Sequence, residues 1–469
     1  MALLLPRILD RAAGDGHLEV RNPFGGAPVA EVGLASAAEL TAAIDRAEAA
    51  RSALAAEEPA ARAARLRGLA AAIEDRAEDF AALITAEAGK PIRLARGEVA
   101  RAVRTFSLAA AEAERDRGED LDLGDRVGRL ERFPAGVCTA ITPFNFPLNL
   151  GAHKVAPALA AGCPIVLKPA EKTPLSSLLL AELLAAAEPP LPVGAWAVLP
   201  ALPAQAGPLV EDPRVRRFSF TGSAAVGWQL KRRAARARVT LELGGNAAAL
   251  IAPDWDDLEA ALDRCAAGAF AFSGQVCISL QRLFVPAARL EEAAAGLAAR
   301  AEALRLGDPA DEATDLGPLI TEEAARRVEQ WIVEATAGGA RVRAGGRRDG
   351  SFVEPTVLTE VPREARLWRE EAFGPVVVLA PYQELDQALA AMDDSAYGLQ
   401  AAVFSRDSAT IERAFRRLEV GQVIVGDSTV FRCDEMPYGG VKASGCGREG
   451  LRWSVEELTE PRLLVRWRP

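Results

Sequence analysis

Five short apolar segments alternate with longer helical stretches between residues 137 and 242 of this 469-residue chain. We predict that these segments are strands, near 137–142, 164–168, 195–199, 215–220 and 238–242. Strands of this length that alternate with helices form a parallel sheet covered on both faces, because each parallel connection needs a crossover. The spacing therefore predicts an α/β fold with a doubly wound sheet of nucleotide-binding type.

A second strand–helix series begins after Gly244 and Gly245, with Ala248–Ile251 as its first strand. Ahead of the first series, residues 36–118 carry Ala and Leu at helical spacing between Arg and Glu, and we predict helices there. A chain of 469 residues is too long for one ordinary domain, so two or three are expected. Since 50% of the residues are apolar and 26% charged, the composition fits large buried cores and excludes disorder.

The helix after the second predicted strand has recognisable ends. Thr173 is predicted as its N-cap, and Pro174 stands in the first turn, where a missing N–H is tolerated. The run Glu188-Pro-Pro-Leu-Pro follows, and we expect the helix to end before it because proline cannot continue a helix.

The composition also excludes several classes of partner. A net charge of −10 offers no basic surface to nucleic acid. Arg and Glu interrupt the Ala-rich segments before they reach membrane-spanning length. The first residues, Met-Ala-Leu-Leu-Leu-Pro, lack the basic front and the length of a signal peptide. The 6 cysteines, none at metal-binding spacing, and the 2 histidines predict a reducing cytoplasm and no metal site.

Three residues in distinctive settings carry the candidate chemistry. Cys277 follows a Gly-Gln turn, and a thiolate is a strong nucleophile towards carbon. Glu242 ends an apolar run before two glycines, and its apolar flanks should raise its pKa towards that of a base for water. Asn145 can offer a side-chain amide to an oxyanion. Together they predict covalent catalysis through a thioester, although a core thiol, an ion-paired carboxylate and a turn residue are the ordinary alternatives.

Seven motifs stand in order along the chain: TPFNFP (142–147), LKPAEKTP (167–174), FTGSAAVG (220–227), LELGGN (241–246), FSGQVC (272–277), EEAFGPVV (370–377) and MPYGGVKASGCGREG (436–450). This set resembles the aldehyde dehydrogenase superfamily. The resemblance implies NAD(P)-dependent oxidation of an aldehyde, through a thiohemiacetal and a thioester, to a carboxylic acid. It makes Cys277 the nucleophile and Glu242 the base that activates water. It places the oxyanion between the amide of Asn145 and the backbone N–H of Cys277.

By the same resemblance, Lys168 contacts the adenosine ribose of the cofactor and Glu171 accepts hydrogen bonds from its hydroxyls. Taken alone, a Lys-Pro pair after a strand is usually a solvated loop. A carboxylate at residue 171 would repel a 2′-phosphate, so we expect NAD in preference to NADP, which stays possible.

Other parts of the cofactor site follow from the motifs. Gly222, Ser223 and Gly227 open the helix after the fourth predicted strand, and a helix N-terminus with small residues suits a pyrophosphate. The resemblance implies that Glu371 and Phe373 contact the nicotinamide ribose and ring. Neighbours of the catalytic residues complete the predicted cofactor set: Thr142, Pro143, Phe144, Leu243 and Gly244.

The substrate end is predicted from four residues. In relatives, the position of Arg432 lines the substrate entrance, and we expect Arg101, His153 and Phe146 to face the same tunnel. Basic and polar residues there favour a small hydroxylated or anionic aldehyde, because arginine binds carboxylate or phosphate with a planar fork. The motif around Arg432 is similar to the lactaldehyde, glyceraldehyde and phosphonoacetaldehyde dehydrogenase branches. A surface or structural ion pair is the alternative for each charged residue.

The pattern and the resemblance together divide the chain into three parts. A Rossmann-like NAD-binding domain takes residues 1–118 and 134–244, and an α/β catalytic domain takes residues 245–457. Residues 119–133 and 458–469 fit neither core, and by resemblance they form a β-flap that pairs with a neighbouring subunit in a homodimer or homotetramer.

Other functions stay open at this stage. A coenzyme A-acylating semialdehyde dehydrogenase is disfavoured by Glu242, which such enzymes generally lack. A cofactor-free cysteine hydrolase would need a base for its thiol, and His17 and His153 are the only histidines. A non-catalytic protein derived from the enzyme is disfavoured because the nucleophile, base and amide are all present.

Overall fold

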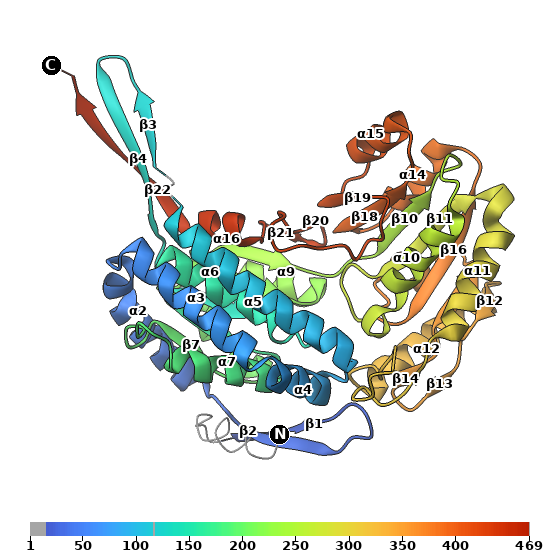
Figure 1. Ribbon diagram of the computed structural model, residues 1–469, viewed down its shortest axis with the longest axis horizontal. Coiled ribbons are helices and arrows are strands. Elements are labelled where there is room, and N and C mark those ends of the chain that lie inside the picture. Colours follow the sequence, from blue (N-terminus) through green and yellow to red (C-terminus); the bar gives the residue numbers. More distant parts are fainter. Residues whose placement is uncertain (1–15, 116–117, 469) are drawn as a thin grey trace.

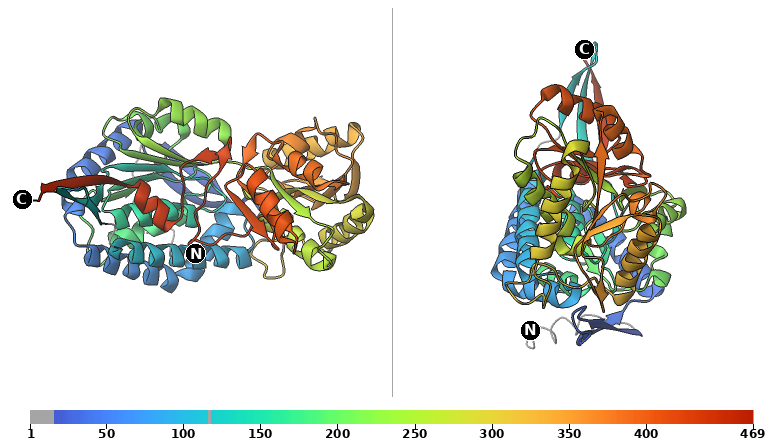
Figure 2. Two further views of the ribbon diagram at one scale, coloured as in Figure 1. Left: turned by 90° about the horizontal axis from the view of Figure 1, so that it is seen from above. Right: turned by 90° about the vertical axis from the view of Figure 1, so that its right-hand side faces the viewer.

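The computed structural model describes residues 16–115 and 118–468. The predicted domain ranges also include residues 1–15, 116–117 and 469, which lie outside the described residues. The chain has a mixed α/β fold with two large, mainly parallel sheets. Each sheet forms a body with its helices, and a narrow three-stranded sheet extends from the first body (Figures 1 and 2). The predicted α/β fold class is confirmed.

The first sheet has 6 strands, in the order β21-β9-β8-β5-β6-β7. Its strands are β5 (Cys138–Ile141), β6 (Ile165–Lys168), β7 (Trp196–Val198), β8 (Arg217–Thr221), β9 (Arg238–Glu242) and β21 (Gly445–Cys446). All five predicted strands are present and parallel, while β21 pairs antiparallel with β9. The chain runs from β5 to β7 on one side and then crosses to β8 and β9 on the other. Ligands of such sheets bind at the carboxyl ends of the strands, beside the point where the direction changes.

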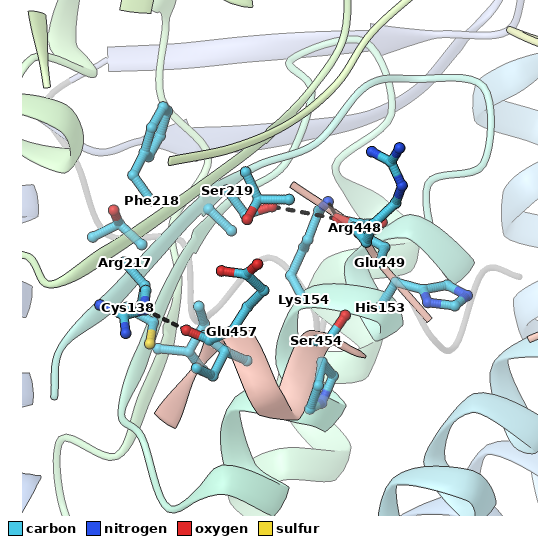
Figure 3. Close-up of a pocket in the computed structure, with 16 residues that line it drawn as sticks. Cys138, His153, Lys154, Arg217, Phe218, Ser219, Arg448, Glu449, Ser454 and Glu457 are labelled. Carbon is cyan, nitrogen blue, oxygen red and sulfur yellow. Dashed lines mark hydrogen bonds and ion pairs between the residues drawn. The ribbon is translucent and has the colours of Figure 1, made fainter. Parts of the chain in front are cut away.

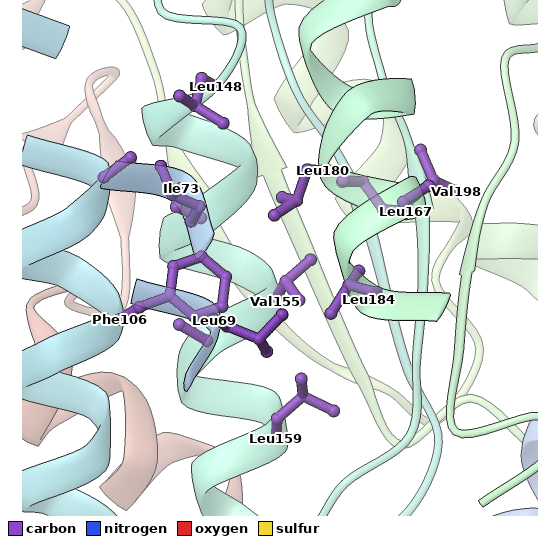
Figure 4. Close-up of a cluster of buried hydrophobic side chains, with 14 of the residues drawn as sticks. Leu69, Ile73, Phe106, Leu148, Val155, Leu159, Leu167, Leu180, Leu184 and Val198 are labelled. Atoms are coloured by element: carbon purple, nitrogen blue, oxygen red, sulfur yellow. The ribbon is translucent and has the colours of Figure 1, made fainter. Parts of the chain in front are cut away.

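Helices cover both faces of this sheet, as predicted for residues 36–118 and for the crossovers. They are α2 (Ala37–Ala55), α3 (Pro59–Asp75), α4 (Ala77–Ala88), α5 (Ile92–Glu114), α6 (Asn149–Ala161), α7 (Leu175–Ala185), α8 (Pro208–Glu211), α9 (Ala224–Arg233) and α16 (Leu451–Glu457), with a 3₁₀ turn at Pro203–Gln205. On one face, Leu69 of α3, Phe106 of α5 and Val155 of α6 pack in a cluster that reaches Leu167 of β6 (Figure 4). Burial of these aliphatic and aromatic side chains is the main force that holds the helices to the sheet.

The start of α7 differs from the prediction. Thr173 does not cap the helix: the N-cap is Pro174, and the hydroxyl of Thr173 lies 3.5 Å from the carbonyl oxygen of Phe144. Instead, the carboxylate of Glu87 in α4 accepts the first backbone N–H groups, at 2.6 Å from the nitrogen of Leu175 and 2.9 Å from that of residue 176. A buried carboxylate is a stronger acceptor than a hydroxyl, and it comes from a segment that local sequence cannot connect to this helix.

The second sheet has 7 strands, in the order β12-β15-β16-β11-β10-β18-β19. They are β10 (Ala247–Ile251), β11 (Leu280–Pro286), β12 (Arg341–Ala344), β15 (Thr356–Thr359), β16 (Val376–Tyr382), β18 (Gln400–Phe404) and β19 (Gln422–Val425). Its helices are α10 (Leu258–Phe270), α11 (Leu290–Ala303), α12 (Glu322–Ala337), α13 (Arg366–Arg369), α14 (Leu385–Asp393) and α15 (Ser408–Arg417), with 3₁₀ turns at Ala271–Gly274 and Ala287–Arg289. Only the β12–β15 pair is antiparallel among the described strands of this sheet.

Smaller sheets complete the fold. The flap consists of β3 (Glu119–Asp122), β4 (Arg126–Pro134) and β22 (Thr459–Trp467), and β22 pairs with β4 along its whole length. The other small strands are β1 (Gly16–Arg21), β2 (Pro28–Leu34), β13 (Arg348–Asp349), β14 (Phe352–Val353), β17 (Tyr397–Gly398) and β20 (Val441–Lys442). The β1–β2 hairpin was not predicted from the sequence. No described helix combines the length and the apolar character needed to cross a membrane.

Candidate active site

Loops from both large sheets meet around a cavity of about 770 Å³, which we name the main cavity. On one side it is lined by the residues that follow β5, β6, β8 and β9. On the other side it is lined by the turn before β11, the loop before β16 and the loop after β19. Cavities of roughly 300–1,000 Å³ are typical of small-molecule sites.

Most of the predicted site residues line the main cavity: Arg101, Thr142, Pro143, Phe144, Asn145, Phe146, Lys168, Glu171, Gly222, Ser223, Glu242, Leu243, Gly244, Cys277, Glu371, Phe373 and Arg432. Two do not. Gly227 lies inside α9, where an added Cβ would come within 2.4 Å of the side chain of Leu243, so its small size serves packing. His153 faces a second, smaller cavity.

A tight turn presents Cys277 to the main cavity. Phe272, Ser273 and Gly274 have φ values of 50°, 54° and 70°, a left-handed run that L residues rarely adopt. The hydroxyl of Ser273 donates to the carbonyl of residue 317 at 2.6 Å, which helps to hold the turn. Burial raises the pKa of Cys277 to about 11, and the hydroxyl of Tyr438, 3.1 Å from its sulfur, acts in the opposite direction.

Asn145 lies beside the turn that carries Cys277. Its side-chain nitrogen donates to the carbonyl oxygen of Gln275 at 3.0 Å, and Gln275 is only two residues from Cys277. An amide nitrogen carries two hydrogens, so one stays available to a ligand in the main cavity. The side-chain oxygen of Asn145 is buried and has no hydrogen-bond partner among the described residues.

Glu242 closes β9 at the edge of the same cavity. Both of its carboxylate oxygens are buried without a hydrogen-bond partner in the described chain. Burial raises its pKa well above the ordinary value, and the negative charge of Glu449 adds to the effect. Glu449 itself forms an ion pair with Lys154. Burial opposes ionisation of Glu449 too, but the Lys154 ammonium outweighs it and the pKa is lowered. The predicted rise in the pKa of Glu242 agrees with the structure.

A small cavity of about 40 Å³ adjoins Glu449 (Figure 3). Glu449 lines both cavities, while Lys154 and His153 line the small one. The volume holds a few water molecules. His153 also lies 2.9 Å from the carboxylate of Asp434, and burial lowers its pKa. The histidine therefore supports the loop that carries Arg432 rather than lining the main cavity.

The carboxyl end of the first sheet has the features of a dinucleotide site. Lys168 lies 3.6 Å from Glu171 where β6 ends. Ser223 is the N-cap of α9 and makes no side-chain cap bond, so the first-turn N–H groups can receive an anion. The hydroxyl of Thr142 is buried without a partner among the described residues. An unpaired polar atom in a cavity wall is costly unless a ligand satisfies it, so these residues fit NAD(P).

The opposite end of the cofactor region is built around Glu371. Its carboxylate accepts the backbone N–H of Gly245 at 2.9 Å, and burial raises its pKa to about 7. A Cβ on Gly244 would stand 2.2 Å from the same carboxylate, so glycine is needed for this close approach. Phe373 packs edge-to-face on Phe144, with 5.8 Å between ring centroids.

The two predicted substrate arginines have different surroundings. Arg101 forms an ion pair with Asp434 at 2.7 Å, which matches the structural alternative for this residue. The guanidinium of Arg432 stacks on the ring of Tyr438, 3.7 Å from its centroid. Its Nε and Nη2 atoms are buried and have no hydrogen-bond partner within residues 16–115 and 118–468. Arg432 therefore presents unpaired donors beside Cys277.

Comparison with known proteins decides the family. A model described as the aldehyde dehydrogenase family matches residues 10–464. The chain belongs to the aldehyde dehydrogenase family. It is therefore an enzyme that oxidises aldehydes with NAD(P), as the motifs predicted.

Relatives and solved structures agree with this assignment. The 3-sulfolactaldehyde dehydrogenase of Priestia aryabhattai is 44% identical over 361 residues, 76% of this chain and 75% of its own length. Aldehyde dehydrogenase 21 from Physcomitrella patens, solved in complex with the reaction product succinate, has a TM-score of 0.95 at 42% identity and covers 97% of this chain and 96% of its own. The glyceraldehyde-3-phosphate dehydrogenase GapN of Methanocaldococcus jannaschii, complexed with NADP, has a TM-score of 0.93 at 35% identity and covers 96% of this chain and 99% of its own.

Several residues of this aldehyde dehydrogenase site were not predicted from the sequence. Tyr438 and Glu449 lie inside the last of the seven motifs, so attention to their polar side chains within that motif would have found them. Lys154 sits in the apolar helix α6, and its partner Glu449 is 295 positions away. Asp434 likewise shows its role only through His153 and Arg101. Contacts of this range leave no local signal.

Proposed function

We propose that this aldehyde dehydrogenase oxidises a small anionic or hydroxylated aldehyde to its carboxylic acid, with NAD as the preferred cofactor. The observation that carries the proposal is the buried guanidinium of Arg432, which has unpaired donors and lines the same cavity as Cys277. Buried N–H donors without an acceptor are unfavourable, and an anionic group on the substrate would accept hydrogen bonds from them. The names of the similar proteins support this view, since sulfolactaldehyde, succinate and glyceraldehyde-3-phosphate are all anions.

The first step forms a bond between the Cys277 sulfur and the aldehyde carbon. Because burial raises the pKa of Cys277 to about 11, the thiol is protonated at neutral pH and must pass its proton to solvent water as this bond forms. Burial also raises the pKa of Tyr438, so its O–H stays neutral and can donate to the sulfur as negative charge develops. The developing oxyanion would accept the free amide hydrogen of Asn145 and the backbone N–H of Cys277. Each such donor is worth about 3–4 kcal/mol in the transition state.

Lys168, Glu171 and Glu371 would hold NAD(P), which would supply a two-electron hydride acceptor. Loss of a hydride from the carbon bonded to Cys277 would leave a thioester. Glu242, when ionised, then takes a proton from water as the oxygen attacks this thioester. The acid leaves and the sulfur of Cys277 regains a proton. Glu449 stays ionised beside Lys154, so its charge keeps the proton affinity of Glu242 high enough for a base.

Three further proposals concern the whole protein. We infer that residues 1–118 and 134–244 form the NAD-binding domain and residues 245–457 the catalytic domain, which is supported by the separate sheets. Residues 119–133 and 458–469 are proposed to assemble subunits, supported by the exposed β-flap. A cytoplasmic location is supported by the 6 cysteines, all free in the structure.

The substrate proposal is tested with matched aldehydes. Succinate semialdehyde and butanal have the same carbon chain, but only the first carries a carboxylate. We expect Arg432→Met to raise KM for succinate semialdehyde about ten- to hundred-fold, the value of a charge-assisted hydrogen bond, and to spare butanal. Arg432→Lys keeps the charge without the planar fork, so its KM for succinate semialdehyde should lie between those of the wild type and Arg432→Met. A wild type that prefers butanal, with Arg432→Met leaving both substrates unchanged, would refute the anionic substrate.

A further inference from the structure

Two buried charged residues, Lys90 and Glu98, lie behind the loop that carries Asn145 and do not line the main cavity. Lys90 lies in the short link between α4 and α5, and Glu98 lies in α5. They form an ion pair whose side chains are only 1% and 0% exposed. Removing both charges from water is unfavourable unless further hydrogen bonds compensate, so their other contacts indicate what the pair does.

These contacts hold the loop after β5 at its middle and at its carboxyl end. The ammonium of Lys90 donates to the backbone carbonyl oxygen of Asn145 at 2.6 Å. The second oxygen of Glu98 accepts the backbone N–H groups of Leu148 and Asn149 at 3.0 and 3.1 Å, where α6 begins. One ion pair therefore fixes the carbonyl of the proposed oxyanion residue and the helix start that follows it.

The same ammonium also contacts the turn that carries the nucleophile. It lies 3.8 Å from the ring centroid of Phe146 and 4.5 Å from that of Phe272, the first residue of the left-handed turn. Cation–π contacts of a desolvated ammonium are favourable and depend on position. On the far side, the Asn145 side chain donates to Gln275 in the same turn. Lys90 thus joins the loop of the amide to the turn of the thiol.

We propose that Lys90, held by Glu98, is a positioning residue that fixes the Asn145 amide relative to Cys277. The proposal rests on the oxyanion role proposed above for Asn145. An oxyanion donor is effective only where the charge develops, and catalytic groups must be held within about 0.5 Å. Both members of the pair act through the backbone of one loop, so their loss would displace the amide without removing it.

Lys90→Met tests this role because it keeps the apolar stem and removes the ammonium. In a single turnover with NAD and a short aldehyde, we expect NADH to appear about 10- to 100-fold more slowly, since a displacement of about 1 Å costs up to that much. The Kd for NAD should stay unchanged. Lys90→Arg, which keeps a charged donor, should recover part of the rate. A wild-type single-turnover rate in Lys90→Met would overturn the proposal.

Glu87→Gln is the control for a change to a buried acidic side chain outside the Asn145 loop. Glu87 is buried three residues before Lys90, caps α7 and has no hydrogen bond to the Asn145 loop. The Glu87→Gln variant should have a lower Tm and an unchanged single-turnover rate. Equal slowing in Glu87→Gln and Lys90→Met would mean that general loosening is responsible, which contradicts positioning. If Lys90→Met does not fold, Glu98→Gln replaces it, because glutamine still accepts both N–H groups but withdraws the counter-charge from Lys90.

A double-mutant cycle separates this inference from the proposed function. If Lys90 acts through Asn145, adding Lys90→Met to Asn145→Ala should not lower the single-turnover rate any further. If the rate decrease in the double variant equals the product of the two single decreases, Lys90 does not act through the Asn145 amide and the proposal is overturned. A fast Asn145→Ala would refute the oxyanion role itself, whereas a slow Asn145→Ala beside a fast Lys90→Met would refute only the role of Lys90.

Discussion

At the scale of single residues, three carboxylates around the main cavity differ because their surroundings differ. Glu242 is buried without a hydrogen-bond partner in the described residues, and its pKa is raised. Glu449 is buried too, but Lys154 keeps it ionised. The side chain of Glu171 is 36% exposed and lies beside Lys168. Burial thus prepares Glu242 to take up a proton, while the ammonium of Lys154 keeps Glu449 charged.

The raised pKa of Glu242 predicts the pH dependence of thioester hydrolysis. Only the ionised carboxylate accepts a proton from water, so the rate should increase as pH rises through the pKa of Glu242. An ordinary glutamate, with a pKa of about 4.3, would already be ionised at about pH 6 and give a flat profile above it. We expect the steady-state rate after the NADH burst to be still rising above about pH 6. A profile that is flat there, or that is unchanged in Glu242→Gln, would show that another group activates the water.

Cofactor preference is predicted to depend on Glu171. Its carboxylate suits two free ribose hydroxyls and repels a 2′-phosphate, so kcat/KM should be higher with NAD than with NADP. Glu171→Ser removes the repulsion and should bring kcat/KM with NADP closer to kcat/KM with NAD, mainly by lowering KM for NADP. Glu371→Gln, at the other end of the cofactor region, should not change the ratio of kcat/KM with NAD to kcat/KM with NADP. Equal or better efficiency of the wild type with NADP would contradict the assignment.

The sequence predicts the reacting groups but not the residues that support them. Cys277, Glu242 and Asn145 stand in motifs whose letters alone indicate chemistry, and the structure brings all three to one cavity. Tyr438 and Lys90 act on them through contacts across 161 and 55 positions. No local pattern encodes such contacts, since they depend on how the elements pack.

At the scale of elements, strands were easier to predict than helix ends. Buried parallel strands are continuous apolar runs bounded by polar residues, so the five parallel strands of the first sheet were located from sequence, whereas the short antiparallel strand β21 was not. The start of α7 was predicted with the wrong cap because the acceptor, Glu87, lies 88 positions from Leu175. The β1–β2 hairpin was missed, since most of its residues are exposed or half-buried and its pattern is not strongly apolar.

The stability of α7 should therefore depend on Glu87 more than on Thr173. Glu87→Ala leaves two buried N–H groups without an acceptor, and each costs about 1–3 kcal/mol. Thr173→Ala removes one long hydroxyl contact and should cost no more than about 1 kcal/mol. Urea unfolding of both variants measures the difference. The account of this cap fails if Thr173→Ala proves the more destabilising change.

At the scale of the whole molecule, neither large sheet holds the site alone. Glu242 ends a strand of the first sheet, Cys277 precedes a strand of the second, and the main cavity lies where their loops meet. The motifs predicted two cooperating bodies because they occur on both sides of Gly244 and Gly245. They predicted most of the side chains that line the main cavity, but not all of them correctly, since His153 faces the small cavity instead. The role of the flap in assembly stays a prediction.

The central claim is that Cys277 carries the substrate as an acyl group until Glu242 activates water. Glu242→Gln should stop the reaction at that stage, so mass spectrometry after mixing with NAD and succinate semialdehyde tests it directly. We predict that the peptide containing Cys277 gains the mass of the aldehyde less two hydrogens, with one equivalent of NADH per adduct and no adduct in Cys277→Ala. An unmodified Cys277 peptide in a variant that still turns over at the wild-type rate would contradict the account.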